Sequence, residues 1–210
     1  MPYGPILLRM IPALLVGCAA VFLAAGASAA RGDQRLTGPG TVCGGTLWRL
    51  MNLSDIDRMK VNLHPEETTI ATIAALHDPR SITPRRTTAF QKQVWRMRTV
   101  VDSYRIASNG EIILILYSID TGQFMNAYLP SLPCLVRKVR DRTGMLSARK
   151  EWTSRCPKAT AAWRLIGVTV EIGGVGYWNP VRTTRHALPN GAELRPVTNL
   201  KIVSGGAECP

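Results

Sequence analysis

The stretch from Gln93 to Leu129, QVWRMRTVVDSYRIASNGEIILILYSIDTGQFMNAYL, decides the fold class. Apolar and polar side chains alternate from Trp95 to Thr99, which is typical of a strand with one side in solvent. Asn109-Gly110 is the strongest two-residue signal for a tight hairpin, and Thr121-Gly122 turns the chain again. Between these turns the residues are almost all apolar, as in a strand covered on both faces. The stretch therefore predicts a meander of three antiparallel strands.

The residues after this meander predict a helix and two further strands. Apolar residues recur at helical spacing between Leu135 and Trp152, and 162–172 and 192–203 have strand character, with an irregular glycine-rich loop between them. This is the order of the oligonucleotide/oligosaccharide-binding (OB) barrel. We predict a mainly β chain with a small OB-like five-stranded antiparallel barrel at 91–210 and a helical insert between strands 3 and 4. Residues 30–90 are expected to form a lead-in with short helices, one of them opened by Pro65 and two glutamates.

The first 29 residues have the pattern of a secretory signal peptide. Arg9 precedes an apolar run at 11–25, and the run ends in small residues with an Ala-x-Ala site at Ala27–Ala29. Cleavage after Ala29 predicts a secreted or periplasmic protein. Two alternatives are an uncleaved anchor and a lipoprotein modified at Cys18, which follows a lipobox-like Leu15-Val16-Gly17. No other run is long and apolar enough for a membrane span, so none is predicted in the mature chain.

Four cysteines remain after residue 29, and an even number in an exported chain predicts two disulfides. Because Cys43 and Cys209 lie near the two ends of the mature chain, and Cys134 and Cys156 bracket one basic segment, we expect these two pairs. Zinc is disfavoured, because no Cys-x-x-Cys or His-x-His spacing occurs.

Composition and charge indicate a folded basic protein. The 210 residues are 46% hydrophobic and 19% charged, which excludes a disordered chain, and the net charge of +12 predicts anionic partners. A merely soluble basic surface is the alternative, and aromatic residues more often fill a core than stack on a ligand. We expect a polyanion or acidic envelope surface to be bound by basic side chains and two loop aromatics: Arg96, Arg98, Arg137, Lys138, Arg140, Tyr177, Trp178, Arg182, Arg185 and Arg195.

No motif in the sequence specifies a reaction. Nucleophile-elbow, phosphate-loop and His-Glu-x-x-His patterns do not occur, and the three histidines have no clear partners in sequence. We therefore predict a non-enzymatic protein with no cofactor. One alternative is a divergent metal-dependent phosphodiesterase or nuclease that uses acids flanking the hairpin, such as Asp102, Glu111 and Asp120, or that depends on Glu193 or His186. Another is an envelope scaffold that binds a second protein.

The tail from Gly174 to Val197, GVGYWNPVRTTRHALPNGAELRPV, resembles a group of uncharacterised secreted bacterial proteins. Weaker similarity extends over the hairpin and the Pro-rich turn before Cys134, so that about half of the mature chain is covered. The resemblance implies export and an OB-like barrel but no reaction. Asn179, Arg182 and Arg195 stand where the group has Asp, His and His. The shared residues imply a turn with positive φ that leads into a strand: Pro189, Asn190, Gly191, Glu193, Leu194 and Pro196.

Overall fold

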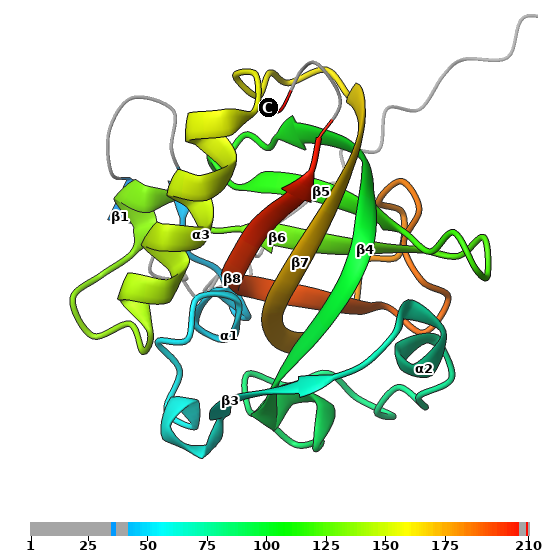
Figure 1. Cartoon of the computed structure of the whole chain (residues 1–210). Helices are drawn as coiled ribbons and strands as arrows, with labels where there is room; N and C mark the ends of the chain where they lie inside the picture. The colour runs from blue at the N-terminus through cyan, green and yellow to red at the C-terminus, as the bar shows by residue number, and fades with distance from the viewer. Residues whose placement is uncertain (1–34, 37–41, 206–208, 210) are drawn as a thin grey trace, which may run out of the picture. The chain divides into compact units, whose positions relative to one another are not determined.

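The computed structural model describes residues 35–36, 42–205 and 209, so the predicted signal segment with Cys18 lies outside the described residues. The chain is mainly β, with six strands in one sheet (Figure 1). These strands are β3 (Asn62–Glu67), β4 (Gln93–Ile106), β5 (Ile112–Tyr117), β6 (Phe124–Leu129), β7 (Arg164–Trp178) and β8 (Ala192–Ser204). A separate pair joins β1 (Arg35–Leu36) to β2 (Val42–Cys43).

The sheet order is β3-β4-β5-β6-β8-β7, and β7 also pairs with β4. The antiparallel meander of β4, β5 and β6 agrees with the sequence prediction. One pairing corrects the expected antiparallel barrel, because β6 runs parallel to β8, and β3, which lies in the expected lead-in, runs parallel to β4. Strand β8 follows β7 in the chain but lies between β6 and β7 in the sheet, antiparallel to β7 and parallel to β6, which a simple meander does not allow.

The edge strand β3 replaces the helix start expected at Pro65. A proline is tolerated there because the outer side of an edge strand needs no backbone donor. The helix α2 (Ile70–Ala74) begins only after Thr69, whose Oγ1 accepts a hydrogen bond from the Thr72 amide at 3.1 Å. Ile70 and Ile73 are the buried residues of this helix.

Strand β7 runs straight through the glycines for which the sequence predicts a loop. A Cβ atom at Gly176 would lie 2.2 Å from the Phe90 carbonyl oxygen, and one at Gly174 would lie 2.9 Å from that of Pro196. Glycine is therefore required here for close backbone packing within a strand, a role that the sequence pattern does not distinguish from a flexible loop. The strand consequently extends to Trp178.

Helix α3 (Arg142–Arg155) lies between β6 and β7 in the chain and packs against β8 (Figure 1). Asp141 caps it, since its Oδ1 accepts a hydrogen bond from the Gly144 amide at 3.2 Å. Met145, Ala148 and Trp152 form its buried face. The short elements are α1 (Trp48–Met51) and three 3₁₀ turns, η1 (Arg58–Lys60), η2 (Phe90–Lys92) and η3 (Leu132–Cys134).

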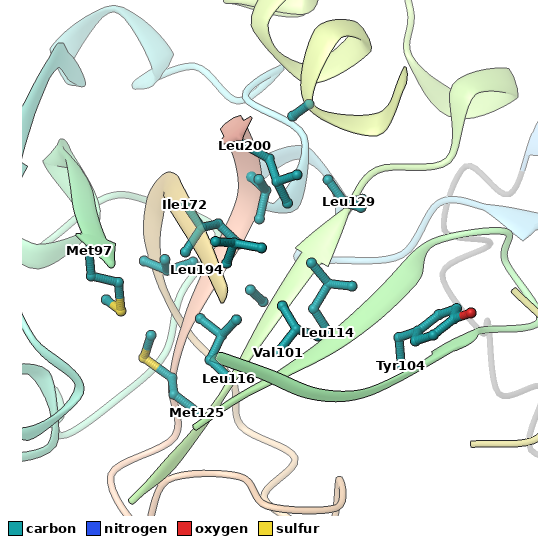
Figure 2. Packing of buried hydrophobic residues seen from close by; sticks show 14 of the residues in the cluster. Met97, Val101, Tyr104, Leu114, Leu116, Met125, Leu129, Ile172, Leu194 and Leu200 are labelled. Atoms are coloured by element: carbon teal, nitrogen blue, oxygen red, sulfur yellow. The ribbon is translucent and has the colours of Figure 1, made fainter. Parts of the chain in front are cut away.

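The main hydrophobic core lies between the inward faces of the strands (Figure 2). Leu114 and Leu116 of β5 and Met125 of β6 point into it, together with Ile172 and Leu194 from β7 and β8. The side chains on the other face of β5 and β6 form a smaller cluster, which contains Ile113, Ile115 and Tyr128. Burial on both faces therefore explains why β5 is apolar at nearly every position. Among the described residues, no helix has the length and apolar character needed to cross a bilayer.

The described residues form two disulfides, but the pairing differs from the prediction. Cys43 bonds to Cys134, and Cys156 bonds to Cys209. The expected Cys134–Cys156 and Cys43–Cys209 bonds are therefore wrong. The fold brings Cys134 to Cys43, with Cα atoms 5.5 Å apart, and Cys156 to Cys209, with Cα atoms 4.4 Å apart, both within the reach of about 7 Å that a disulfide allows.

Candidate functional site

The structure places the predicted basic residues on separate parts of the molecule. Arg96 and Arg98 are exposed on β4, and Arg96 pairs with Glu67. Arg137 and Lys138 are exposed in the loop before α3.

The loop between β7 and β8 holds two further predicted residues, Arg182 and Arg185. Arg182 pairs with Asp78, and Arg185 lies over the Trp163 ring, 5.7 Å from its centroid. Both side chains are therefore already engaged with groups of the chain itself.

Three of the predicted contact residues are buried, which corrects their expected role. Tyr177 and Trp178 are 0% and 1% exposed, because they end strand β7 instead of standing in a loop. Trp178 packs against Phe90, and its indole N–H donates to the Thr88 hydroxyl at 2.9 Å. Arg195 is also buried and forms an ion pair with Glu111. None of these three side chains presents a free surface to a polymer.

Arg140 joins the segment around η1 to the loop before α3. Its guanidinium Nη1 donates to the carbonyl oxygens of Arg58 and Val61, each at 2.6 Å, and its amide donates to the Leu53 carbonyl at 3.0 Å. Leu53 and Val61 also share a hydrophobic cluster with Val139. Arg140 thus has a structural role, and it holds the two segments side by side.

We call the exposed side chains of the two joined segments, residues 56–60 and 132–142, the two-loop surface. It carries both apolar and basic residues. Its exposed members are Ile56, Met59, Lys60, Leu132, Pro133, Val136, Arg137, Lys138 and Arg142.

Two acidic residues beside the exposed side chains of the two-loop surface, Asp55 and Asp57, are buried. Asp55 forms a buried ion pair with Arg86 at 2.8 Å. Asp57 accepts hydrogen bonds from Arg85 at 2.6 Å and 3.0 Å, and Lys60 contacts it at 2.9 Å. The Arg85 and Lys60 hydrogen bonds hold the pKa of Asp57 well below its ordinary value. These carboxylates therefore have their cations already in place.

A second candidate is a buried polar cluster on β6, β7 and β8. Asn126, Glu193 and Tyr177 lie side by side on these three strands, because Glu193 is in register with both other residues. Glu193 Oε1 accepts hydrogen bonds from Asn179 Nδ2 at 2.8 Å and from the Tyr128 hydroxyl at 3.3 Å.

The electrostatics of this cluster depend on burial. Burial raises the pKa of Glu193 to about 7, although Arg195, Asn179 and Tyr128 partly oppose the shift. Burial alone would lower the pKa of Arg195, but the carboxylates of Glu111 and Glu193 outweigh it and raise that pKa. The cluster therefore holds the Arg195 guanidinium between two carboxyl groups, and burial raises the pKa of one of them, Glu193.

Several polar atoms in this cluster have no hydrogen-bond partner. They are both amide atoms of Asn126, the Tyr177 hydroxyl and Glu193 Oε2. Unpaired buried polar atoms are uncommon in folded proteins. The sequence indicated Glu193 through the tail pattern, but Asn126 and Tyr128 occur in an ordinary strand pattern and had no separate signal.

A hollow of about 250 Å³ lies beside the middle of β4. Arg98 is the only one of the predicted binding residues in its lining, which also includes Tyr117 and Asp120. Arg98 is in register with Glu171 on β7. The lining itself contains one basic and one acidic side chain, Arg98 and Asp120, so the hollow does not concentrate positive charge.

Among the residues considered for metal-dependent hydrolysis, Glu111 and Glu193 come together, but they share the Arg195 guanidinium between them. Glu111 and Asp120 flank opposite ends of β5, and at about 3.3 Å per residue that strand separates them by roughly 20 Å or more. Glu111 is bound to Arg195, and His186 stacks on Phe124 with ring centroids 4.1 Å apart. The described residues contain no group of three His, Cys, Asp or Glu side chains arranged to hold a metal ion.

Comparison of the sequence with protein-family models and with curated proteins finds no match.

Proposed function

We propose that the chain is an exported, non-enzymatic binding module with an OB-like barrel, which binds an anionic polymer or an acidic envelope surface. In this proposal the barrel consists of β4, β5, β6, β8 and β7, and the β4–β7 pairing supports it because it links the two ends of that row. The place of α3 between β6 and β7 agrees with the OB order. The two disulfides support export, since such bonds persist in oxidising compartments.

The observation that carries the binding proposal is the charge separation at the two-loop surface. Of its nearby carboxylates, Asp55 and Asp57 are engaged by Arg86 and Arg85, and Asp141 accepts a hydrogen bond from the Gly144 amide. Arg137 and Lys138 are exposed on the same surface. A positive surface whose neighbouring acids are already paired attracts anions from solution, because those acids do not compete for the exposed cations.

Heparin binding tests this proposal. We expect the protein to elute from immobilised heparin at a lower salt concentration when Arg137 and Lys138 are both replaced by alanine. With fewer cationic contacts, binding releases fewer counterions from heparin and is therefore weaker at a given salt concentration. Replacement of Lys158 and Lys201 by alanine is the matched control, since it removes the same net charge from exposed positions outside the two-loop surface. Equal losses for both double variants would show a diffuse basic surface, and binding that does not change with salt would remove the electrostatic proposal.

A further inference from the structure

The two-loop surface also carries apolar side chains that are left in water. Ile56 and Met59 are 74% and 69% exposed, and Val136 and Leu132 are 46% and 43% exposed. They are four of the eight large hydrophobic side chains that are exposed in the described part of the chain. An exposed apolar group set among polar residues is a common mark of an interaction surface.

These apolar side chains belong to loops that are already held in place. The Arg140 guanidinium bonds to the carbonyls at both ends of the η1 turn, those of Arg58 and Val61. On the other loop, the Val139 amide donates to the Val136 carbonyl at 3.2 Å. Figure 1 shows η1 and the loop before α3 on the same side of the chain, near α1. These hydrogen bonds hold the loops that present the apolar side chains, which lowers the cost of ordering them on binding.

Basic residues lie close in sequence to apolar residues in both loops. Residues 56–60 read Ile-Asp-Arg-Met-Lys, with the aspartate paired with Arg85, and residues 136–138 read Val-Arg-Lys. A hydrophilic polyanion would leave the four apolar side chains in water. A single-stranded nucleic acid is usually held by stacking on aromatic rings, and neither loop contains an aromatic residue.

We propose that the two-loop surface docks on an anionic lipid bilayer. Ile56, Met59 and Val136 enter the boundary between headgroups and acyl chains, while Arg137 and Lys138 stay at the level of the negatively charged headgroups. This inference rests on the proposed function and names the partner of the same surface. What the inference adds to the proposed function is the contact of apolar side chains with lipid, which a protein that binds soluble polyanions does not need.

Vesicle co-sedimentation tests the inference. The protein is recovered from the periplasm of an expression host, and mass spectrometry confirms that all variants have the same N-terminus. We expect binding to vesicles of phosphatidylglycerol and phosphatidylcholine, and little binding to phosphatidylcholine alone. Replacing Ile56 and Met59 by serine should weaken binding to the anionic vesicles by about tenfold or more. The same variant should elute from heparin as the wild type does.

The matched control replaces Ile119 and Leu165, which are 72% and 68% exposed on other parts of the molecule, by serine. This control should bind the anionic vesicles as the wild type does, and circular dichroism should show that both variants are folded. Wild-type binding by the Ile56/Met59 variant, equal losses in both variants, or equal binding to both kinds of vesicle would overturn the inference. Salt-dependent heparin binding without vesicle binding would also overturn it but would leave the proposed function standing. Failure to bind either heparin or vesicles would end both proposals.

Discussion

Glu193 is a carboxyl group that the fold keeps out of water. It is 1% exposed, and its Oε2 has no hydrogen-bond partner, while Arg195 is shared with Glu111. Burial disfavours the charged form, and for this reason the pKa of Glu193 rises to about 7. Asp57 shows the opposite case, since Arg85 lowers its pKa and its carboxylate stays charged. Two acids in one chain are thus shifted in opposite directions by their surroundings.

Replacing Glu193 by glutamine should change how stability depends on pH. Because its pKa is raised in the folded protein, the folded state holds a proton between about pH 4.5 and 7 that the unfolded chain has released. The contribution of Glu193 is therefore most favourable below its unfolded pKa and is lost as the pH rises through about 7. Glutamine stays neutral, so Glu193→Gln should gain stability relative to the wild type from about pH 5 to about pH 8. Urea unfolding at both pH values measures the free energy of unfolding of the variant and of the wild type. If the difference between the two proteins were the same at both pH values, it would contradict the raised pKa.

The C-terminal part of β7 shows why an apparent loop sequence forms a strand. Its glycines let the backbone approach the carbonyl groups of Phe90 and Pro196, and the Phe90 carbonyl also accepts a hydrogen bond from the Trp95 indole at 2.9 Å. Phe90 also packs on Trp178. The close contact between the β7 backbone and Phe90 therefore helps to position Tyr177 and Trp178 at the end of β7. The packing in turn buries Tyr177 beside Glu193.

Gly176→Ala should destabilise the protein by about 1–3 kcal/mol or more, because overpacking against backbone is not relieved by a change of rotamer. Gly173→Ala on the same strand is the control, since its added Cβ would meet its nearest atom, Asn199 Cβ, at 3.4 Å. Thermal unfolding of the two variants compares them directly. Similar Tm values would show that the Phe90 segment moves aside without cost.

The two disulfides connect parts that are far apart in the chain. Cys43–Cys134 joins the segment before α1 to the loop after β6, and Cys156–Cys209 joins the end of α3 to the chain beyond β8. Their sequence separations are 91 and 53 residues. Cys134 lies within the loop that carries half of the two-loop surface, so the first bond also anchors that surface.

Loss of either disulfide should lower stability. Closing loops of this length restricts the unfolded chain by about 4 kcal/mol in the entropic account. We therefore expect the double variant Cys43→Ser/Cys134→Ser and the double variant Cys156→Ser/Cys209→Ser each to unfold at a clearly lower temperature than the wild type. Peptide mapping of the unreduced protein checks the pairing itself, and a peptide that joins Cys134 to Cys156 would contradict the structure.

Local patterns were enough to predict much of the strand plan and part of the proposed binding surface. The meander follows from two short turn signals and from alternating side chains, which are properties of neighbouring residues. Arg137 and Lys138 were recognised because a run of basic residues is visible in the sequence. Ile56 and Met59 were not, because an apolar residue in a short loop looks the same whether it packs inside or remains in solvent.

Contacts between distant segments account for the rest. The parallel β6–β8 pairing, the pairing of the cysteines and the burial of Arg195 all depend on which segments meet after the chain has folded back. Cys134 and Cys156 are close in sequence, yet each is bonded to a cysteine from a distant segment. The spacing of apolar residues and the turn residues are properties of a few neighbouring positions, so the sequence by itself determines where most strands and helices form. Burial and charge pairing depend on which segments meet in the assembled core, so only the tertiary structure decides them.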